Sequence, residues 1–437
     1  MKKQLSVIVS IACLLGVVTG FSSAAVAPKE NSYEQDLAAA YQCLEVYGEL
    51  LDGFALSSTA LLKSSERKIA MDDIDYPDDY AGAYFNADGD RKLNIYLTDF
   101  ENLDYYKDIL GDKIVNYYDV DYSFNDLYNL YDFSDNDMIK WGINSVSIDD
   151  KNNEVDITMK DDKYISPFVD YLKLNNYDPE IANFEVSDEQ ISTLSETIIE
   201  NANTGISSTD ITTSATKSAR SGELVKGVSD QWFLHPDGYY YKKVSLGTIT
   251  CNAYDPTTGK YGVILSGHQV TPSIPTTFRN TEDELINSNP AEWKSSVVEK
   301  GDCAFIPFDS SMNYVPSIFL TNATSGSLSF INRTQFITSP GLNGSPIVQY
   351  GNTTGKQTGT ITNLFYSYPT TNGLVHTDFI QTDITAISGD SGGPMGIDTP
   401  DGLYLMGNIT AGGPSISTIT KYNNIESILG VEILTLN

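Results

Sequence analysis

The residues best suited to covalent chemistry lie in the hexapeptide Gly-Asp-Ser-Gly-Gly-Pro at positions 389–394. A serine hydroxyl is a weak nucleophile until a neighbouring base takes its proton, and the anionic intermediate that follows needs preorganised N–H donors. Glycines beside a serine let the backbone turn two N–H groups toward one point. The hexapeptide therefore predicts a nucleophile at Ser391. We expect the carboxylate of Asp390 to anchor the loop by an ion pair, with a newly formed N-terminal amine as a candidate partner.

This hexapeptide is the nucleophile motif of the chymotrypsin-like serine proteases, which the sequence resembles. The resemblance implies an upstream histidine and aspartate, in the order His, Asp, Ser. The chain has 3 His, and His268 follows the apolar run 261–266 at the end of an expected hairpin, where the family places its base. His235 precedes that hairpin, and His376 alternates within an expected strand. The resemblance thus implies His268 as the catalytic base.

Asp302 opens the string Asp-Cys-Ala-Phe-Ile, which is similar to the family's Asp-x-Ala-apolar segment. The apolar residues after it favour a buried carboxylate over an exposed turn aspartate, and such a carboxylate would orient the ring of His268. The implied reaction is peptide hydrolysis through an acyl-enzyme. The N–H groups of Gly389 and Ser391 would form the oxyanion hole, and no metal or cofactor is required.

Two further strings are similar to segments of the bacterial streptogrisin-type proteases. Gly-Asn-Thr-Thr-Gly at 351–355, followed by Thr-Gly-Thr at 358–360, resembles their Gly-Thr-Thr-Gly…Gly segment. Thr-Ala-Gly-Gly at 410–413 resembles their Thr-Ser-Gly-Gly strand, to which substrate adds as a β-strand. The resemblance covers about residues 223–437 and implies an all-β, double β-barrel catalytic domain.

Family spacing also implies the residues that bind substrate. Thr385 would lie at the base of the primary specificity pocket, with Ala411, Gly412 and Gly413 on the neighbouring strand. None of these side chains carries a charge. We therefore expect cleavage after an uncharged residue.

The sequence departs from the family pattern at two positions. Gln269 stands where the family usually has a cysteine, and Ala411 replaces a serine that commonly supports the buried aspartate. In a secreted chain Cys251 and Cys303 could form a disulfide; two buried free thiols are the alternative.

The first 200 residues indicate an export signal and a separate α+β unit. Residues 1–27 combine Lys2 and Lys3, an apolar run and small residues, which is typical of a secretory signal peptide. We expect an α+β prodomain over 28–200, with a helix over 34–63, a strand over 92–98 and a hairpin over 146–159. This half also resembles the prodomains of streptogrisin and α-lytic proteases, which implies a folding chaperone and inhibitor; an unrelated N-terminal binding domain is the alternative.

The unpatterned Ser- and Thr-rich stretch 201–222 is expected to be a linker that contains the activation cleavage. After it, short apolar runs separated by turn residues predict strands, among them 243–253, 261–266, 304–308, 359–367, 374–384 and 403–410. Residues 422–429 predict a helix. Many short strands joined by turns are typical of a sandwich or barrel.

The charge supports a division into two units. The 437 residues carry 27 Lys+Arg and 58 Asp+Glu, a net charge of −31. Residues 1–200 hold 39 acidic and 15 basic residues, a net charge of −24, so only −7 belongs to the remainder. Such acidity disfavours nucleic acid or an anionic membrane as partner. The expected partners are protein or peptide substrates and the chain's own prodomain, and the expected location is extracellular.

Two other classes of function compete with the protease. A non-catalytic binding protein that keeps the protease fold would usually have lost the serine or histidine, and both are present. A serine esterase would favour a Gly-x-Ser-x-Gly elbow with the order Ser, Asp, His, which this chain contradicts.

Overall fold

The computed structural model describes most of the chain. The described residues are 30–57, 74–201 (apart from 88, 112, 114, 133–134, 189–190 and 195), 217–234, 240–270, 276–321, 328–332, 342–370, 373–400, 402–413 and 415–435. Residues 36–437 form one compact unit. The expected signal peptide and most of the expected linker lie outside the described residues. The domain boundaries at 200 and 222 stay predictions.

Two β-β-α-β units follow the long helix α2 (Glu30–Ser57). The first comprises β1 (Tyr80–Phe85), β2 (Leu93–Leu97), α3 (Leu103–Leu110) and β3 (Val115–Asp119); the second comprises β4 (Ile143–Asp149), β5 (Glu154–Met159), α6 (Ile165–Leu174) and β6 (Ala182–Val186). In each unit a hairpin comes first, and a helix then carries the chain across to a third strand parallel to the second. Between and beside them lie α4 (Phe124–Tyr131), α5 (Asp135–Trp141), η3 (Asp162–Tyr164) and η4 (Pro179–Ile181). The two units share this order of elements, but no internal sequence repeat is evident.

The first barrel consists of two sheets that face one hydrophobic core. Within the described residues, one sheet has the order β14 (Leu285–Asn287), β13 (Thr276–Arg279), β9 (Leu224–Leu234), β10 (Tyr240–Thr248), β8 (Glu196–Asn201). The other has the order β15 (Lys294–Val298), β16 (Gly301–Pro307), β12 (Lys260–Leu265), β11 (Cys251–Asp255), β25 (Glu432–Ile433). Val225, Phe278 and Ile286 of the first sheet share a buried cluster with Val263 and Ile306 of the second. The connections include η5 (Gly267–Gln269) and η6 (Pro290–Glu292).

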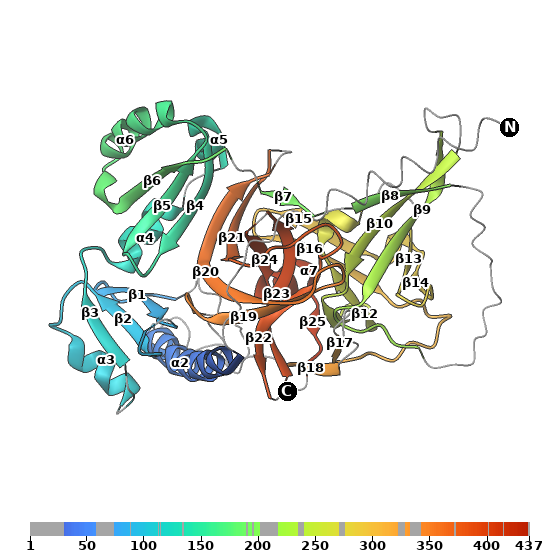
Figure 1. The fold of residues 1–437 in the computed structure, drawn as a ribbon, viewed down its shortest axis with the longest axis horizontal. Coiled ribbons are helices and arrows are strands. Elements are labelled where there is room, and N and C mark those ends of the chain that lie inside the picture. Colours follow the sequence, from blue (N-terminus) through green and yellow to red (C-terminus); the bar gives the residue numbers. More distant parts are fainter. Residues whose placement is uncertain are drawn as a thin grey trace. The chain divides into compact units, whose positions relative to one another are not determined.

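The second barrel is a closed ring of antiparallel strands. In the described part of the chain the ring runs β19 (Pro346–Gly351), β20 (Gly355–Pro369), β21 (Val375–Thr382), β24 (Ser417–Lys421), β23 (Gly402–Gly412), β22 (Pro394–Thr399) and back to β19. These strands are drawn in orange and red in Figure 1. Strands β17 (Phe319–Thr321) and β18 (Leu328–Asn332) join at β23, and α7 (Tyr422–Leu429) follows the ring. The long strands β20 and β23 extend beyond the ring and pair there with further strands.

Residues 36–188, called the N-terminal part below, are joined to the second barrel. Strand β4 pairs with β20, which places Ser147 opposite Tyr366. One continuous buried cluster contains Phe54 of α2, Val155 of β5 and Ile361 of β20. The N-terminal part and the second barrel therefore share a hydrophobic core.

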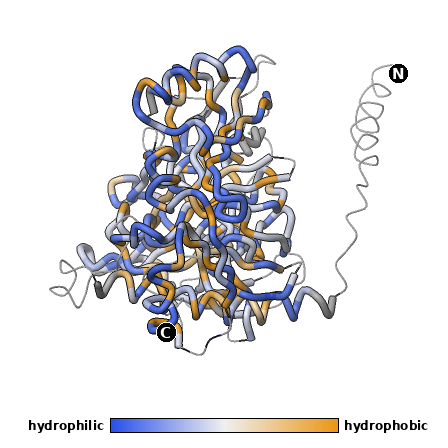
Figure 2. The backbone as a smooth tube through the Cα atoms, turned by 90° about the vertical axis from the view of Figure 1, so that its left-hand side faces the viewer, coloured by the Kyte–Doolittle hydropathy of each residue, from blue (hydrophilic) through white to orange (hydrophobic). Residues whose placement is uncertain are grey.

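The fold class predicted from the sequence is confirmed: an α+β region precedes two β-barrels. The helix, strand and hairpin predicted in the first 200 residues are α2, β2 and β4–β5, and the predicted helix 422–429 is α7. Each strand-like run after residue 222 contains a strand. In Figure 2 hydrophobic and hydrophilic stretches alternate along the coloured tube. No helix among the described residues has the length and apolar character needed to span a membrane.

Candidate active site

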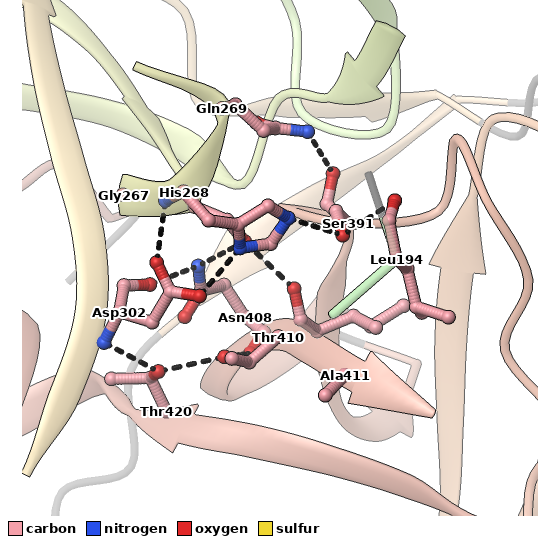
Figure 3. Close-up of polar contacts among 12 residues, drawn as sticks. Leu194, Gly267, His268, Gln269, Asp302, Ser391, Asn408, Thr410, Ala411 and Thr420 are labelled. Atoms are coloured by element: carbon pink, nitrogen blue, oxygen red, sulfur yellow. Dashed lines mark hydrogen bonds and ion pairs between the residues drawn. The ribbon is translucent and has the colours of Figure 1, made fainter. Parts of the chain in front are cut away.

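The three residues of the expected triad come from both barrels and meet at hydrogen-bonding distance. His268 lies in η5, directly after β12, and Asp302 lies in the adjacent strand β16. Ser391 lies in the loop that enters β22. His268 Nδ1 is 2.5 Å from Asp302 Oδ2, and His268 Nε2 is 3.0 Å from Ser391 Oγ (Figure 3). The arrangement has the order of a base between a nucleophile and an orienting carboxylate.

Asp302 holds the histidine through two contacts. Its side chain is fully buried, and its Oδ1 accepts a hydrogen bond of 2.7 Å from the backbone N–H of His268. Burial favours the neutral carboxyl, but the charge of His268 and its hydrogen bonds outweigh burial and hold the pKa of Asp302 below its ordinary value. Asp302 therefore carries its negative charge beside His268 at neutral pH.

Threonines take part of the supporting role left open by Ala411. Thr420 Oγ1 accepts a hydrogen bond of 3.2 Å from the backbone N–H of Asp302 and lies 2.8 Å from Thr410 Oγ1. Both threonines are fully buried. The pair fixes the backbone of Asp302.

In the uncleaved chain the nucleophile loop is anchored by backbone N–H groups, and the expected ion pair of Asp390 with a newly formed N-terminal amine stays a prediction. Asp390 is fully buried, and its carboxylate accepts hydrogen bonds from the backbone N–H groups of Thr353 (2.9 Å), Thr354 (3.0 Å) and Ile387 (3.1 Å). A Cβ atom at Gly351 would lie 2.0 Å from Asp390 Oδ1. The 351–355 string therefore forms a cradle for this carboxylate.

Thr248, which the sequence did not single out, and Gln269, noted only as a replaced cysteine, tie the first barrel to the nucleophile loop. Thr248 donates from its backbone N–H to Ser391 O (2.7 Å) and from Oγ1 to Gly389 O (2.8 Å). Gln269 Nε2 donates to Ser391 O at 3.0 Å. Gln269 thus links the histidine turn to the nucleophile from the position where the family has a cysteine. A Cβ atom at Gly247 would lie 1.5 Å from this amide nitrogen, so the glycine makes room for it.

The disulfide between Cys251 and Cys303 is not formed, and both are buried free thiols. Cys251 of β11 pairs with Ile264 of β12, which in turn pairs with Phe305 of β16. Cys251 and Cys303 therefore lie two strands apart, roughly 9–10 Å at the usual strand spacing, beyond the reach of a disulfide. Burial raises the pKa of both thiols.

The chain's own residues occupy the front of the site. Strand β7 (Ser192–Thr193) pairs antiparallel with β23, with Thr193 opposite Ala411 and Ser192 opposite Gly412. Farther along the chain β8 pairs antiparallel with β10. Between the two strands Leu194 lies in front of the nucleophile, and its carbonyl oxygen accepts a hydrogen bond of 3.1 Å from Ser391 Oγ (Figure 3).

The residues expected to bind substrate lie around this segment. Ala411 and Gly412 belong to β23, and Gly413 follows them. A Cβ atom at Gly412 would lie 2.9 Å from Ala386 O, so this glycine permits close packing between neighbouring segments. Thr385 is exposed, and its carbonyl oxygen accepts a hydrogen bond from Gln349.

The other two histidines do not contact Ser391 in the described structure. His376 is buried in β21, and its Nδ1 lies 3.1 Å from Val298 O. Burial lowers the pKa of His376. His235 lies outside the described residues.

Solved structures similar to this chain include bacterial proteases. Thermobifida fusca protease A is 17% identical, with a TM-score of 0.37, and Nocardiopsis protease is 17% identical, with a TM-score of 0.38. Cellulomonas bogoriensis chymotrypsin is 19% identical, with a TM-score of 0.36; each match covers 50% of this chain and 100% of the other. No family model and no curated protein matches the chain. These TM-scores are low, and the chymotrypsin-like fold is assigned from the strand pairings above.

Proposed function

We propose that the protein is a secreted serine endopeptidase made as a pro-enzyme. The observation that supports this best is the position of His268, within hydrogen-bonding distance of both Ser391 and the buried Asp302. His268 would take the proton of Ser391 as Oγ attacks a peptide carbonyl and would give it to the leaving amine. The N–H groups of Gly389 and Ser391 would bind the oxyanion.

The N-terminal part and the segment 191–194 that follows it are proposed to act together as an intramolecular chaperone and inhibitor. The core that the N-terminal part shares with the second barrel supports the first role, and Leu194 in front of Ser391 supports the second. The anchoring of Asp390 by backbone N–H groups supports inhibition by occupancy of the cleft, because the nucleophile loop is already held in place in the uncleaved chain.

Hydrolysis of an unfolded protein substrate tests the proposal. The secreted preparation is expected to cleave reduced casein, and Ser391→Ala is expected to remove the activity. The Ser345→Ala variant, which leaves the triad intact, is a matched control for loss of a single buried hydroxyl. Cleavage of a small ester with no cleavage of the protein would contradict the endopeptidase assignment.

A further inference from the structure

The chain's own segment Ile191–Leu194 lies in the cleft in the manner of a substrate. Antiparallel pairing of β7 with β23 fixes its backbone, as in recognition by an added β-strand. Its two ends leave Ser391 along different barrels, since β7 pairs with the second barrel and β8 with the first. The segment therefore shows which side-chain positions the cleft encloses.

The position directly in front of the nucleophile encloses an apolar side chain. Leu194 is 6% exposed, and it shares a buried cluster with Ile384 and Ala386, which precede the nucleophile loop. Leucine is the uncharged, medium-sized residue that fits this environment. A carboxylate buried here would lose its hydration.

The position three residues earlier meets an aromatic surface. Ile191 packs against a buried cluster of Tyr366, Tyr368, Phe379 and Ala411. The ring centroids of Tyr368 and Phe379 are 5.8 Å apart, and Tyr368 Oη lies 3.0 Å from Thr418 Oγ1. With its hydroxyl satisfied, the ring of Tyr368 offers apolar surface. Ile191 is partly buried, and Ser192, between it and Leu194, is exposed.

We infer that the cleft recognises substrates by two apolar residues, the first and the fourth before the scissile bond, and that the bond after Leu194 is the one that the protein cleaves in itself. This inference rests on the proposed function. It places the first cleavage ahead of the 201–222 stretch expected from the sequence. The residues that follow Leu194 would then remain attached to the catalytic part.

In the intact chain the Leu194 carbonyl lies next to Ser391 but does not yet occupy the oxyanion hole. A hydroxyl has a single proton, and Ser391 donates it to Leu194 O, although His268 Nε2 also lies 3.0 Å away. In the part of the chain that the structure describes, no hydrogen bond engages the N–H of Gly389 or Ser391. The carbonyl of Leu194 must turn toward these donors before attack.

The cleavage then follows a balanced acyl transfer. Ser391 Oγ bonds to the carbonyl carbon of Leu194, the C–N bond to residue 195 breaks, and His268 passes the serine proton to the leaving amine. A water molecule next supplies its hydroxyl to the acyl carbon and, through His268, its proton to Ser391. The products are a carboxylate at Leu194 and an amine at residue 195.

The test uses the full chain, its self-processed form and a peptide. The secreted chain is expected to yield a new N-terminus that reads Ser-Glu-Thr-Ile, from residue 195 onward, and Ser391→Ala is expected to stay intact. The processed preparation is then assayed on the peptide Gln-Ile-Ser-Thr-Leu-Ser-Glu-Thr, residues 190–197. In this peptide Leu194→Asp should lower kcat/KM more than about 100-fold, and Ile191→Ala about 10-fold. Ser192→Ala, the matched control, should leave it within about twofold.

The enzyme variant Tyr368→Leu provides a second readout. It should shrink the preference for isoleucine over alanine at position 191 of the peptide, while cleavage after Leu194 persists. A first cleavage within 201–222, or equal rates for the parent peptide and its Ile191→Ala variant, would overturn the inference and leave the proposed function intact. Absence of any cleavage, with Ser391 unreactive toward a fluorophosphonate, would overturn both.

Discussion

The first barrel closes around a core of its own, whereas the second shares its core with the N-terminal part. Phe278 and Ile306 belong to a cluster confined to the first barrel and the residues that flank it. Ile361 of the second barrel belongs to a cluster that extends to Phe54 of α2. Since His268 and Asp302 come from the first barrel and Ser391 from the second, the N-terminal part is joined to the barrel that supplies the nucleophile. The difference suggests that removal of the N-terminal part affects the two contributions to the site unequally.

The largest effect on kcat should come from substituting a catalytic residue of either barrel. Ser391→Ala and His268→Ala should each lower kcat by about 10⁶-fold, because neither residue works without the other. The double variant should be no slower than either single one. Circular dichroism provides the control for folding. A double variant far slower than both singles would mean that the two barrels act independently.

Core truncations should separate the two barrels. Phe365 of the second barrel packs against Phe124 and Tyr131 of α4, with ring centroids 5.5 and 5.9 Å away, while Phe278 packs against Trp293 within the first barrel. Phe365→Ala and Phe278→Ala should each cost about 3–5 kcal/mol of unfolding free energy. Only Phe365→Ala should also weaken the association of the N-terminal part with the barrels. Co-elution of the two parts after cleavage of the chain between them measures this association. Equal loosening by both variants would contradict separate cores.

The contact of the N-terminal part with Asn343 should depend on pH. Asp150 is buried after β4, accepts a hydrogen bond from Asn343 Nδ2 and has a second oxygen without a partner in the described structure. Burial, with a smaller effect of Asp149, raises the pKa of Asp150 well above its ordinary value of 3.8. Its stabilising contribution is therefore complete below pH 3.8 and is lost as the pH rises through the raised pKa.

The nicked protein should accordingly release its N-terminal part more readily as the pH rises. Asp150→Asn should flatten this dependence, because an amide does not titrate, and the exposed Asp78→Asn should leave it unchanged. Dissociation followed by size-exclusion chromatography from pH 4 to 8 measures it. Tighter association with rising pH would show that the sign is wrong.

The smallest effect should come from the link between the barrels at Gln269. Gln269→Met removes one hydrogen bond to Ser391 O, but the N–H of Thr248 still donates to the same oxygen. Loss of one such bond is worth about 1 kcal/mol, so kcat should fall about 5–10-fold. Gln357→Met, on the partly exposed β20, is the control. An unchanged kcat would mean that Gln269 only fills space.

Short strings predicted much of the second barrel and the triad because their information is local. The glycines around Ser391, the apolar run before His268 and the one after Asp302 each specify a turn or a strand end. The partner of Asp390 was not predictable in this way, since its hydrogen-bond donors at 353–354 reach it only after β19 and β20 have formed. The cysteine pairing stayed open for the same reason, because strand order is a tertiary property.

The segment that lies in the cleft, Ile191–Leu194, could not be predicted from the local sequence either. Nothing in Ile-Ser-Thr-Leu distinguishes it from the Ser- and Thr-rich residues after it, and the sequence favoured those for cleavage. Its position depends on pairing with β23 and β10, which lie far along the chain. Gln269 was visible only as a missing cysteine, and its hydrogen bond to Ser391 appears only in the folded chain.

Labelling with a fluorophosphonate tests most directly whether Ser391 is an activated nucleophile. The self-processed protein is treated with the probe, digested and mapped by mass spectrometry, with Ser391→Ala and heat-denatured protein as controls. We expect a single adduct, on Ser391, that both controls lack. A folded, processed protein whose Ser391 stays unlabelled would contradict the assignment as a serine endopeptidase.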